Sequence, residues 1–153
     1  MIHYEDLIVG ETEEFGAYEV SREEVIEFAS KYDPQPFHLD DEAAAATYFG
    51  RLSASGWHTA AMTMRMMVDN FSQKQRASLG SPGIDELRWL KPVYPGDTLS
   101  VTSELIEKRR SKSRPEMGIM RAKSTTWNQH GEAVMTLVSN GLIKVRDPDA
   151  PID

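Results

Sequence analysis

The spacing of hydrophobic positions changes about half-way along this 153-residue chain. In the first half, apolar residues recur every three or four positions, which is typical of helices. In the second half, segments rich in Val, Thr, Ile and Leu alternate with turn signals at 84–90, 98–108, 118–127 and 133–145. Their short connections favour antiparallel hairpins. The pattern predicts an α+β fold in which a curved antiparallel sheet wraps around one long helix.

The first helix has clear start and stop signals. Residues 1–20 are expected to hold a short strand, and the sequence from Ser21 to Glu24 then forms a capping box. Apolar residues follow at helical spacing, at Val25, Phe28, Ala29 and Tyr32. Because Pro34 disfavours the helical conformation of the preceding residue, the helix should end at Asp33. Asp33 is therefore expected at the edge of the next loop.

Two more helices are predicted before the sheet. Acidic residues at 40–42 suit the positive end of a short helix that runs to Tyr48. A longer helix of about 18 residues, or ~27 Å, begins at Gly56. Its apolar stripe consists of Trp57, Ala60, Ala61, Met64, Met67, Val68 and Phe71. Met62 and Met66 widen this stripe, so we expect the long helix to be enclosed on several sides.

Composition limits the possible functions. The hydrophobic fraction of 40% and the charged fraction of 27% are ordinary for a globular protein, and we expect a single domain over 1–153 with a frayed tail at 147–153. A net charge of −7 argues against nucleic-acid binding. The absence of cysteine excludes disulfides, thiolate metal sites and cysteine nucleophiles. Without a signal peptide or an apolar run of ~20 residues, a cytoplasmic protein with no membrane contact is expected.

The candidate chemistry lies in the run from Asp33 to His38. Two prolines, Pro34 and Pro36, stiffen the backbone between the acid and the imidazole. Such a loop is either a plain turn after a helix or a dyad held at fixed separation, and spacing alone leaves both open. Gly56 adds a backbone N–H in the first turn of the long helix, where the helix dipole would stabilise an oxyanion. Together these groups suit proton chemistry beside a polarised carbonyl.

Three segments carry a resemblance to a known family. They are the loop from Asp33 to Asp40 with the alanine-rich helix after it, the Ser55-Gly56 helix start, and the run from Arg88 to Asp97. In this arrangement the chain resembles the MaoC-like dehydratases and (R)-specific enoyl-CoA hydratases, which are hot-dog-fold proteins. The family loop reads Asp, any, Asn, Pro, any, His, and Asp33, Pro36 and His38 match it. Gln35 stands at the family's asparagine, and Ser55 stands where histidine is frequent.

The resemblance implies a hydro-lyase that works as a homodimer or higher homo-oligomer. Asp33 and His38 would hold a water that adds to the β-carbon of a trans-2-enoyl thioester, giving an (R)-3-hydroxyacyl thioester, or the reverse. The Gly56 N–H would bind the thioester oxygen, with Pro36, Ser55 and Trp57 as further substrate-binding residues. The substrate itself would carry coenzyme A or acyl-carrier-protein phosphopantetheine, and no other cofactor or metal is expected.

Other features have two interpretations. The basic run 108–114 is either a solvated hairpin tip or, through Arg109 and Arg110, a contact for coenzyme A phosphates across a dimer. His58 is expected to be a packed histidine, and Met62, Met64, Met66 and Met67 to be ordinary core or the lining of an acyl tunnel. The alternative functions are a hot-dog acyl-CoA thioesterase and a non-catalytic acyl-thioester-binding subunit.

Overall fold

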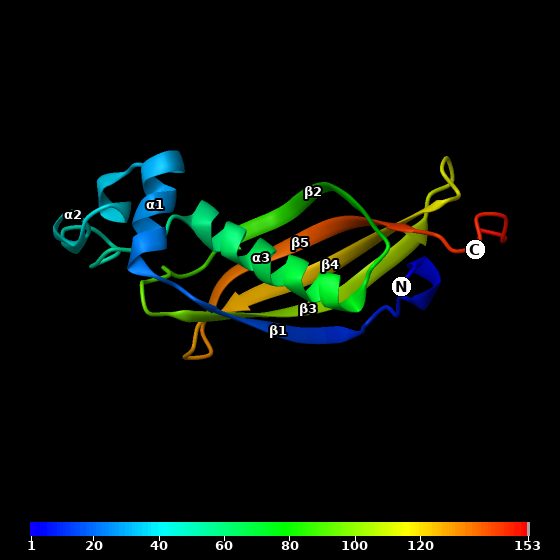
Figure 1. The fold of residues 1–153 in the computed structure, drawn as a ribbon, viewed down its shortest axis with the longest axis horizontal. Coiled ribbons are helices and arrows are strands. Elements are labelled where there is room, and N and C mark those ends of the chain that lie inside the picture. The colour runs from blue at the N-terminus through cyan, green and yellow to red at the C-terminus, as the bar shows by residue number, and fades with distance from the viewer. Residues whose placement is uncertain (153) are drawn as a thin grey trace.

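The computed structural model describes residues 1–152. Figure 1 shows a curved sheet with one long helix lying across a face of it. The strands are β1 (Thr12–Glu19), β2 (Ser78–Trp89), β3 (Thr98–Arg110), β4 (Met117–Trp127) and β5 (Ala133–Lys144). They form one five-stranded sheet in the order β1-β3-β4-β5-β2, and each neighbouring pair is antiparallel. The predicted α+β architecture, a curved antiparallel sheet around a long helix, is confirmed.

The helices follow the predicted order. They are α1 (Arg22–Tyr32), α2 (Asp41–Ala45) and α3 (Gly56–Lys74), with short 3-10 turns η1 (Tyr4–Asp6) and η2 (Pro36–His38). Helix α2 is shorter than predicted, because the Thr47 hydroxyl donates to the Ala44 carbonyl and Gly50 then turns the chain with a φ of +71°. None of the helices within residues 1–152 is long and apolar enough to cross a membrane.

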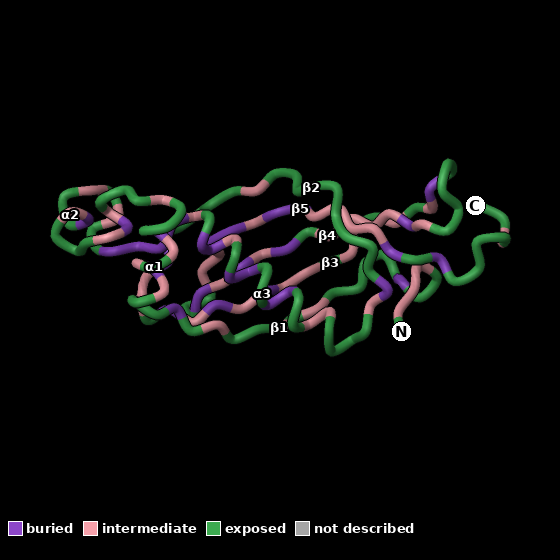
Figure 2. Tube along the Cα trace, turned by 45° about the horizontal axis from the view of Figure 1, so that its top comes forward, coloured by how far each residue is buried: buried purple, intermediate pink, exposed green. Residues whose placement is uncertain are grey.

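Helix α3 covers the main core. Met62, Met66 and Met67 are buried together with Leu99, Val101, Val134, Met135 and Leu137 of the sheet. Figure 2 shows the buried positions running along the strands. These three methionines are therefore ordinary core residues.

The buried face of α3 differs from the predicted apolar stripe. Trp57, Met64 and Val68 are exposed in the single chain, at 61%, 47% and 45%. The buried positions include Thr59 and Thr63, and this is possible because the Thr63 hydroxyl pairs with the Thr126 hydroxyl at 2.8 Å. The helix is thus enclosed on one side, and its exposed apolar residues lie on the other.

Strand β2 is longer than predicted. It begins at Ser78, six residues before the predicted segment 84–90, and includes the glycines and the proline at 80–83. The register of its pairing with β5 shifts at Gly80 and Gly83. Glycine and proline are tolerated here because β2 is an edge strand of the sheet. Apart from Leu87, each residue of β2 is exposed.

The C-terminal segment is held in place as far as residue 152. The Arg110 guanidinium donates to the carbonyls of Pro148, Ala150 and Pro151 at 2.7–3.1 Å. The Arg146 side chain pairs with Asp6 at 2.5 Å. The tail expected to fray at 147–153 thus contacts the β3–β4 hairpin through Pro148, Ala150 and Pro151, and residue 153 lies outside the described residues.

The paired hydroxyls under α3 lead to a stability prediction. Thr63→Val or Thr126→Val alone leaves one buried hydroxyl without a partner, and each should destabilise the protein by about 1–3 kcal/mol. The double variant removes both groups and should recover most of that loss. Urea unfolding of the four proteins at one concentration measures the coupling. Additive losses would show that the two hydroxyls do not depend on each other.

Candidate active site

The loop after α1 carries the predicted acid and imidazole. Asp33 caps the C-terminus of α1, and its N–H donates to the Ala29 carbonyl at 2.9 Å. Pro36 opens η2, whose last residue is His38. Pro36 is exposed, and its role in the fold is to set this turn. The stiff loop therefore brings Asp33 and His38 together, as the sequence predicts.

His38 is oriented by the backbone. Its ring is 5% exposed, and Nδ1 lies 2.7 Å from the Ser53 carbonyl oxygen. Since a carbonyl only accepts hydrogen bonds, the proton of the neutral ring resides on Nδ1. The lone pair is then on Nε2, which lies 3.5 Å from Oδ2 of Asp33. This nitrogen can therefore accept a hydrogen bond beside the carboxylate.

The Asp33 carboxylate receives a donor on each oxygen. Gln35 Nε2 donates to Oδ1 and the Ser55 hydroxyl donates to Oδ2, both at 2.7 Å. Burial acts to raise the pKa of Asp33, but these bonds and the nearby His38 outweigh it, so the pKa lies below its ordinary value. When the His38 ring carries its proton on Nδ1 alone, its Nε2 and the ionised carboxylate are both acceptors. A water between them could donate one hydrogen to each.

Helix α3 begins with free amide groups. Ser55 is its N-cap residue, but the side chain makes no capping bond, and its hydroxyl donates to Asp33 instead. Within residues 1–152, the N–H groups of Gly56 and Trp57 have no hydrogen-bond partner. Unpaired first-turn amides at the positive end of a helix dipole are suited to bind an anion or an oxyanion.

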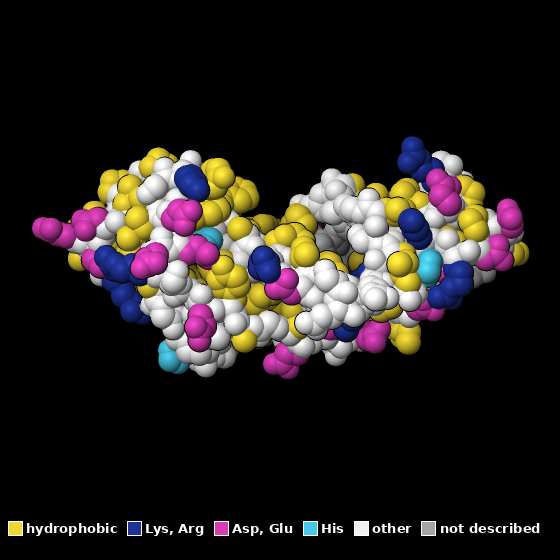
Figure 3. Space-filling view, in the orientation of Figure 1, with side chains coloured by type: hydrophobic (Ala, Val, Ile, Leu, Met, Phe, Trp, Pro, Cys, Tyr) yellow, Lys and Arg dark blue, Asp and Glu magenta, His cyan; other side chains and the backbone are white. Residues whose placement is uncertain are grey.

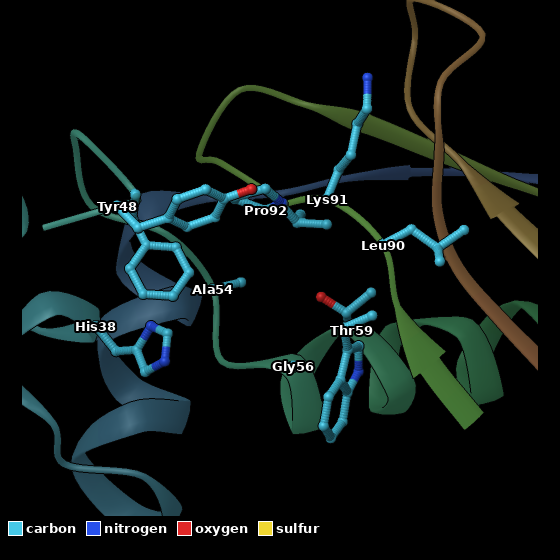
Figure 4. Close-up of a pocket in the computed structure, with 11 residues that line it drawn as sticks. His38, Tyr48, Ala54, Gly56, Thr59, Leu90, Lys91 and Pro92 are labelled. Atoms are coloured by element: carbon cyan, nitrogen blue, oxygen red, sulfur yellow. The ribbon is translucent and has the colours of Figure 1, made fainter. Parts of the chain in front are cut away.

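A cavity of about 220 Å³ joins the imidazole to the helix start. Its lining is mostly aromatic and apolar, from His38, Tyr48, Phe49, Ala54, Gly56, Thr59, Trp89, Leu90, Lys91, Pro92 and Val93. Figure 4 shows His38 and Gly56 near each other, with Leu90, Lys91 and Pro92 supplied by the segment after β2. Asp33 does not line the cavity, and stands beside Nε2 of His38.

Comparison with known proteins identifies the family. Residues 8–128 match the family described as the MaoC like domain. This chain belongs to the MaoC-like domain family. It is 41% identical over 69 residues to mesaconyl-CoA hydratase of Cereibacter sphaeroides, covering 45% of this chain and only 20% of that protein.

Solved structures agree with the family. A MaoC-like dehydratase from Rhodospirillum rubrum is 40% identical, with a TM-score of 0.86 over 96% of this chain and 99% of that one. The (R)-hydratase from A. caviae involved in PHA biosynthesis shares the fold, with a TM-score of 0.68, 24% identity and coverage of 88% and 96%. The MaoC-like domain described here is therefore a hot-dog fold in a hydratase and dehydratase family.

The sequence of this MaoC-like domain did not predict the aromatic residues that line the cavity. Tyr48 and Phe49 follow α2, and Trp89 ends β2. Trp57, a predicted substrate-binding residue, does not line the cavity, but its ring meets Trp89 edge-on at 5.0 Å. Trp57 and Trp89 are more than 30 positions apart in the sequence, so their contact is visible only in the folded structure.

Arg109 and Arg110 are not brought to the cavity within one chain. The β3–β4 hairpin that holds them lies at the opposite end of the molecule from α1 and α2 (Figure 1). Arg110 is bound to the C-terminal segment, whereas the Arg109 side chain is exposed beside a second cavity. A phosphate contact by these residues stays a prediction that requires a second copy of the chain.

His58 is packed, as predicted, on the other flank of α3. Its ring stacks on Phe28 at 4.7 Å, and Nε2 lies 3.2 Å from Oε1 of Glu24. Glu24 therefore does not close the capping box that the sequence predicts, because its carboxylate also receives the Tyr18 hydroxyl. Burial lowers the pKa of His58 more than Glu24 raises it. Residues 1–152 hold no group of three or more side chains arranged to bind a metal ion.

The Trp89 ring gives a prediction for Gly56. A Cβ at Gly56 would lie 2.5 Å from Cε2 of that ring, so Gly56→Ala should displace Trp89 and destabilise the domain by about 1–3 kcal/mol. Gly83→Ala is the matched control, because a Cβ there meets no atom within 4 Å. Chemical unfolding and the indole N–H resonance of Trp89 report the two effects. Equal behaviour of the two variants would contradict the close packing.

Proposed function

We propose that this MaoC-like domain catalyses the reversible hydration of a trans-2-enoyl thioester to the (R)-3-hydroxyacyl thioester. The observation that carries the proposal is the 3.5 Å separation of His38 Nε2 and Asp33 Oδ2, two acceptors facing each other beside the cavity. Gly56, whose N–H has no hydrogen-bond partner within residues 1–152, lines the same cavity. An acceptor pair for water and a donor for a carbonyl oxygen are what hydration of a conjugated thioester requires.

The proposed hydration needs only water, the Asp33–His38 dyad and the Gly56 N–H. As the water oxygen bonds to the β-carbon, one water proton passes to the dyad, with Asp33 as general base and His38 as its partner. The C=C electrons shift toward the thioester, and the Gly56 N–H holds the negative carbonyl oxygen. The dyad then gives a proton to the α-carbon, which regenerates the starting protonation state. Dehydration runs the same steps backward, with the acid and base roles exchanged.

The names of the relatives support this reaction class. Mesaconyl-CoA hydratase is similar over part of its length, as is β-methylmalyl-CoA dehydratase of Chloroflexus aurantiacus at 37% identity over 84 residues. Both names describe addition or removal of water on a CoA thioester. Because this chain spans 20% and 23% of those proteins, their substrates are not assigned to it. The carrier in our proposal is coenzyme A or acyl-carrier protein.

The proposal includes a homodimer. The exposed apolar side of α3 carries Trp57, Met64 and Val68, and the exposed edge strand β2 lies next in sequence. Figure 3 shows hydrophobic side chains gathered over the middle of the face on which α3 lies. A second copy that paired along β2 would continue the sheet and cover this stripe, which otherwise leaves large apolar side chains in water.

Removal of either dyad residue should abolish most of the activity. Asp33→Asn takes away the proton acceptor and His38→Ala takes away the imidazole, so each should lower kcat for crotonyl-CoA hydration at least about a hundredfold. Loss of the enoyl absorbance band measures the rate. Asp69→Asn and His130→Ala, both exposed and away from the cavity, are the matched controls. Near-full activity in either dyad variant would refute the proposal.

The same assay separates the alternative functions. Free thiol released without a change at the enoyl band would indicate a thioesterase. Saturable binding of enoyl thioesters without turnover, over a panel of acyl chains, would indicate a non-catalytic binding subunit. Chiral analysis of the product tests the (R) configuration.

Arg109 provides a test of the dimer and of the phosphate contact together. Arg109→Glu should raise KM for the CoA ester and leave KM for a short N-acetylcysteamine thioester unchanged, because only coenzyme A carries the phosphates. Mixing Arg109→Glu chains with inactive Asp33→Asn chains should restore low-KM turnover, since each intact dyad would meet an intact Arg109 from its partner. An unchanged KM for the CoA ester would assign the basic run to a solvated hairpin tip. Arg110 is left intact because it binds the C-terminal segment.

A further inference from the structure

Two residues beside Asp33 have side chains that the reaction steps above do not use. The Ser55 hydroxyl donates to Oδ2 and the Gln35 amide donates to Oδ1, each at 2.7 Å. Neither residue lines the cavity with His38 and Gly56. Both stand where the chain differs from the family loop it resembles, so both donors to the carboxylate come from these two positions.

Ser55 is an unusual helix N-cap. A serine in this position ordinarily accepts a hydrogen bond from an amide of the first turn, which stabilises the helix by about 1 kcal/mol. Here the residue is fully buried, the capping bond is absent, and the hydroxyl donates to Asp33. Two other side chains, Ser21 and Asp40, do cap their helices in this protein, α1 and α2. The missing cap of α3 thus coincides with a bond to the reactive carboxylate.

Gln35 completes the arrangement from the loop side. The residue is exposed and lies between the two prolines, while its side-chain amide folds back two residues to Asp33. With one donor on each oxygen, rotation of the carboxylate about its last side-chain bond would break both hydrogen bonds. Oδ2 can accept one more hydrogen bond, and we assign it to the water shared with Nε2 of His38, which lies 3.5 Å from Oδ2.

We propose that Ser55 and Gln35 are positioning residues that clamp the Asp33 carboxylate, so that Oδ2 stays beside Nε2 of His38. The inference rests on the proposed hydratase function, since it assigns the clamp to the reacting water. Ser55 has a double effect. It fixes Oδ2, and because it does not cap α3, the second amide of the helix, that of Trp57, stays free beside that of Gly56.

Kinetics of Ser55→Ala and Gln35→Met test the clamp. Gln35→Met keeps the length of the side chain and removes its donor. Because neither residue lines the cavity, kcat should fall about tenfold for each lost bond to a charged group while KM stays unchanged. Because hydrogen bonds to the ionised form lower a carboxyl pKa, their loss raises the pKa of Asp33, and the acid limb of the kcat profile should move to higher pH. Ser55→Thr keeps a hydroxyl, so its kcat and the acid limb of its pH profile should match those of the unmodified protein.

A second measurement does not require turnover. The ¹³C resonance of the Asp33 carboxyl, titrated by NMR, should show a higher pKa in Ser55→Ala and in Gln35→Met than in the unmodified protein. Ser30→Ala is the control, because its hydroxyl bonds only to the Ile26 carbonyl on α1. An unchanged titration, or a rise in KM without a fall in kcat, would overturn the clamp. An unmodified protein that hydrates no enoyl thioester would instead refute the proposed function, while the titration still decides whether the clamp exists.

Discussion

The hydrogen bond from the Ser55 hydroxyl to Asp33 connects the two halves of the site. One partner ends the loop that precedes α3, and the other caps the C-terminus of α1. The one hydrogen of the Ser55 hydroxyl goes to Asp33, and its oxygen accepts no bond from the α3 amides. The bond to Asp33 favours an ionised carboxylate, and the start of α3 has no side-chain cap. A capping serine accepts from the second or third amide of the helix, so the first amide, that of Gly56, is available to the thioester oxygen in the proposed mechanism.

The rest of the structure keeps α1 and α3 in this relation. At the other end of α1, Glu24 accepts from Tyr18 of β1 and lies 3.2 Å from His58 in the first turn of α3. Burial and the contact with Glu24 raise the pKa of Tyr18 to about 12, so the phenol remains a donor at neutral pH. Helix α1 is thus tied to the start of α3 through both of its ends, and β1 is tied to the same network. Because helix ends fray when they are not bound, a site built from two helix ends depends on such contacts to keep its geometry.

Much of the fold follows from local signals in the sequence. Pro34 was enough to place the end of α1, and the period change predicted a strand from residue 84, six residues after the observed start of β2. The loop from Asp33 to His38 could be assigned because its prolines and its reactive residues are adjacent in the chain. The buried face of α3 could not be predicted in this way, because the hydroxyl of buried Thr63 is paired with that of Thr126, 63 positions away. The role of Ser55 was missed for the same reason. The family resemblance predicts it as a substrate-binding residue, and only the position of Asp33, 22 residues earlier, shows where its hydroxyl goes.

The aromatic contacts link the cavity to the surface proposed for dimerisation. Trp89 ends the exposed edge strand β2, packs against Gly56 and meets Trp57 on the exposed side of α3. The wall of the cavity and the apolar stripe are therefore parts of one aromatic unit. In the single chain this unit is open to water, which weakens a hydrogen bond from an amide to an oxyanion. A second copy that covered Trp57 and extended β2 would lower the local dielectric at the start of α3. On this argument, assembly strengthens the oxyanion interaction even where the partner supplies no reactive group.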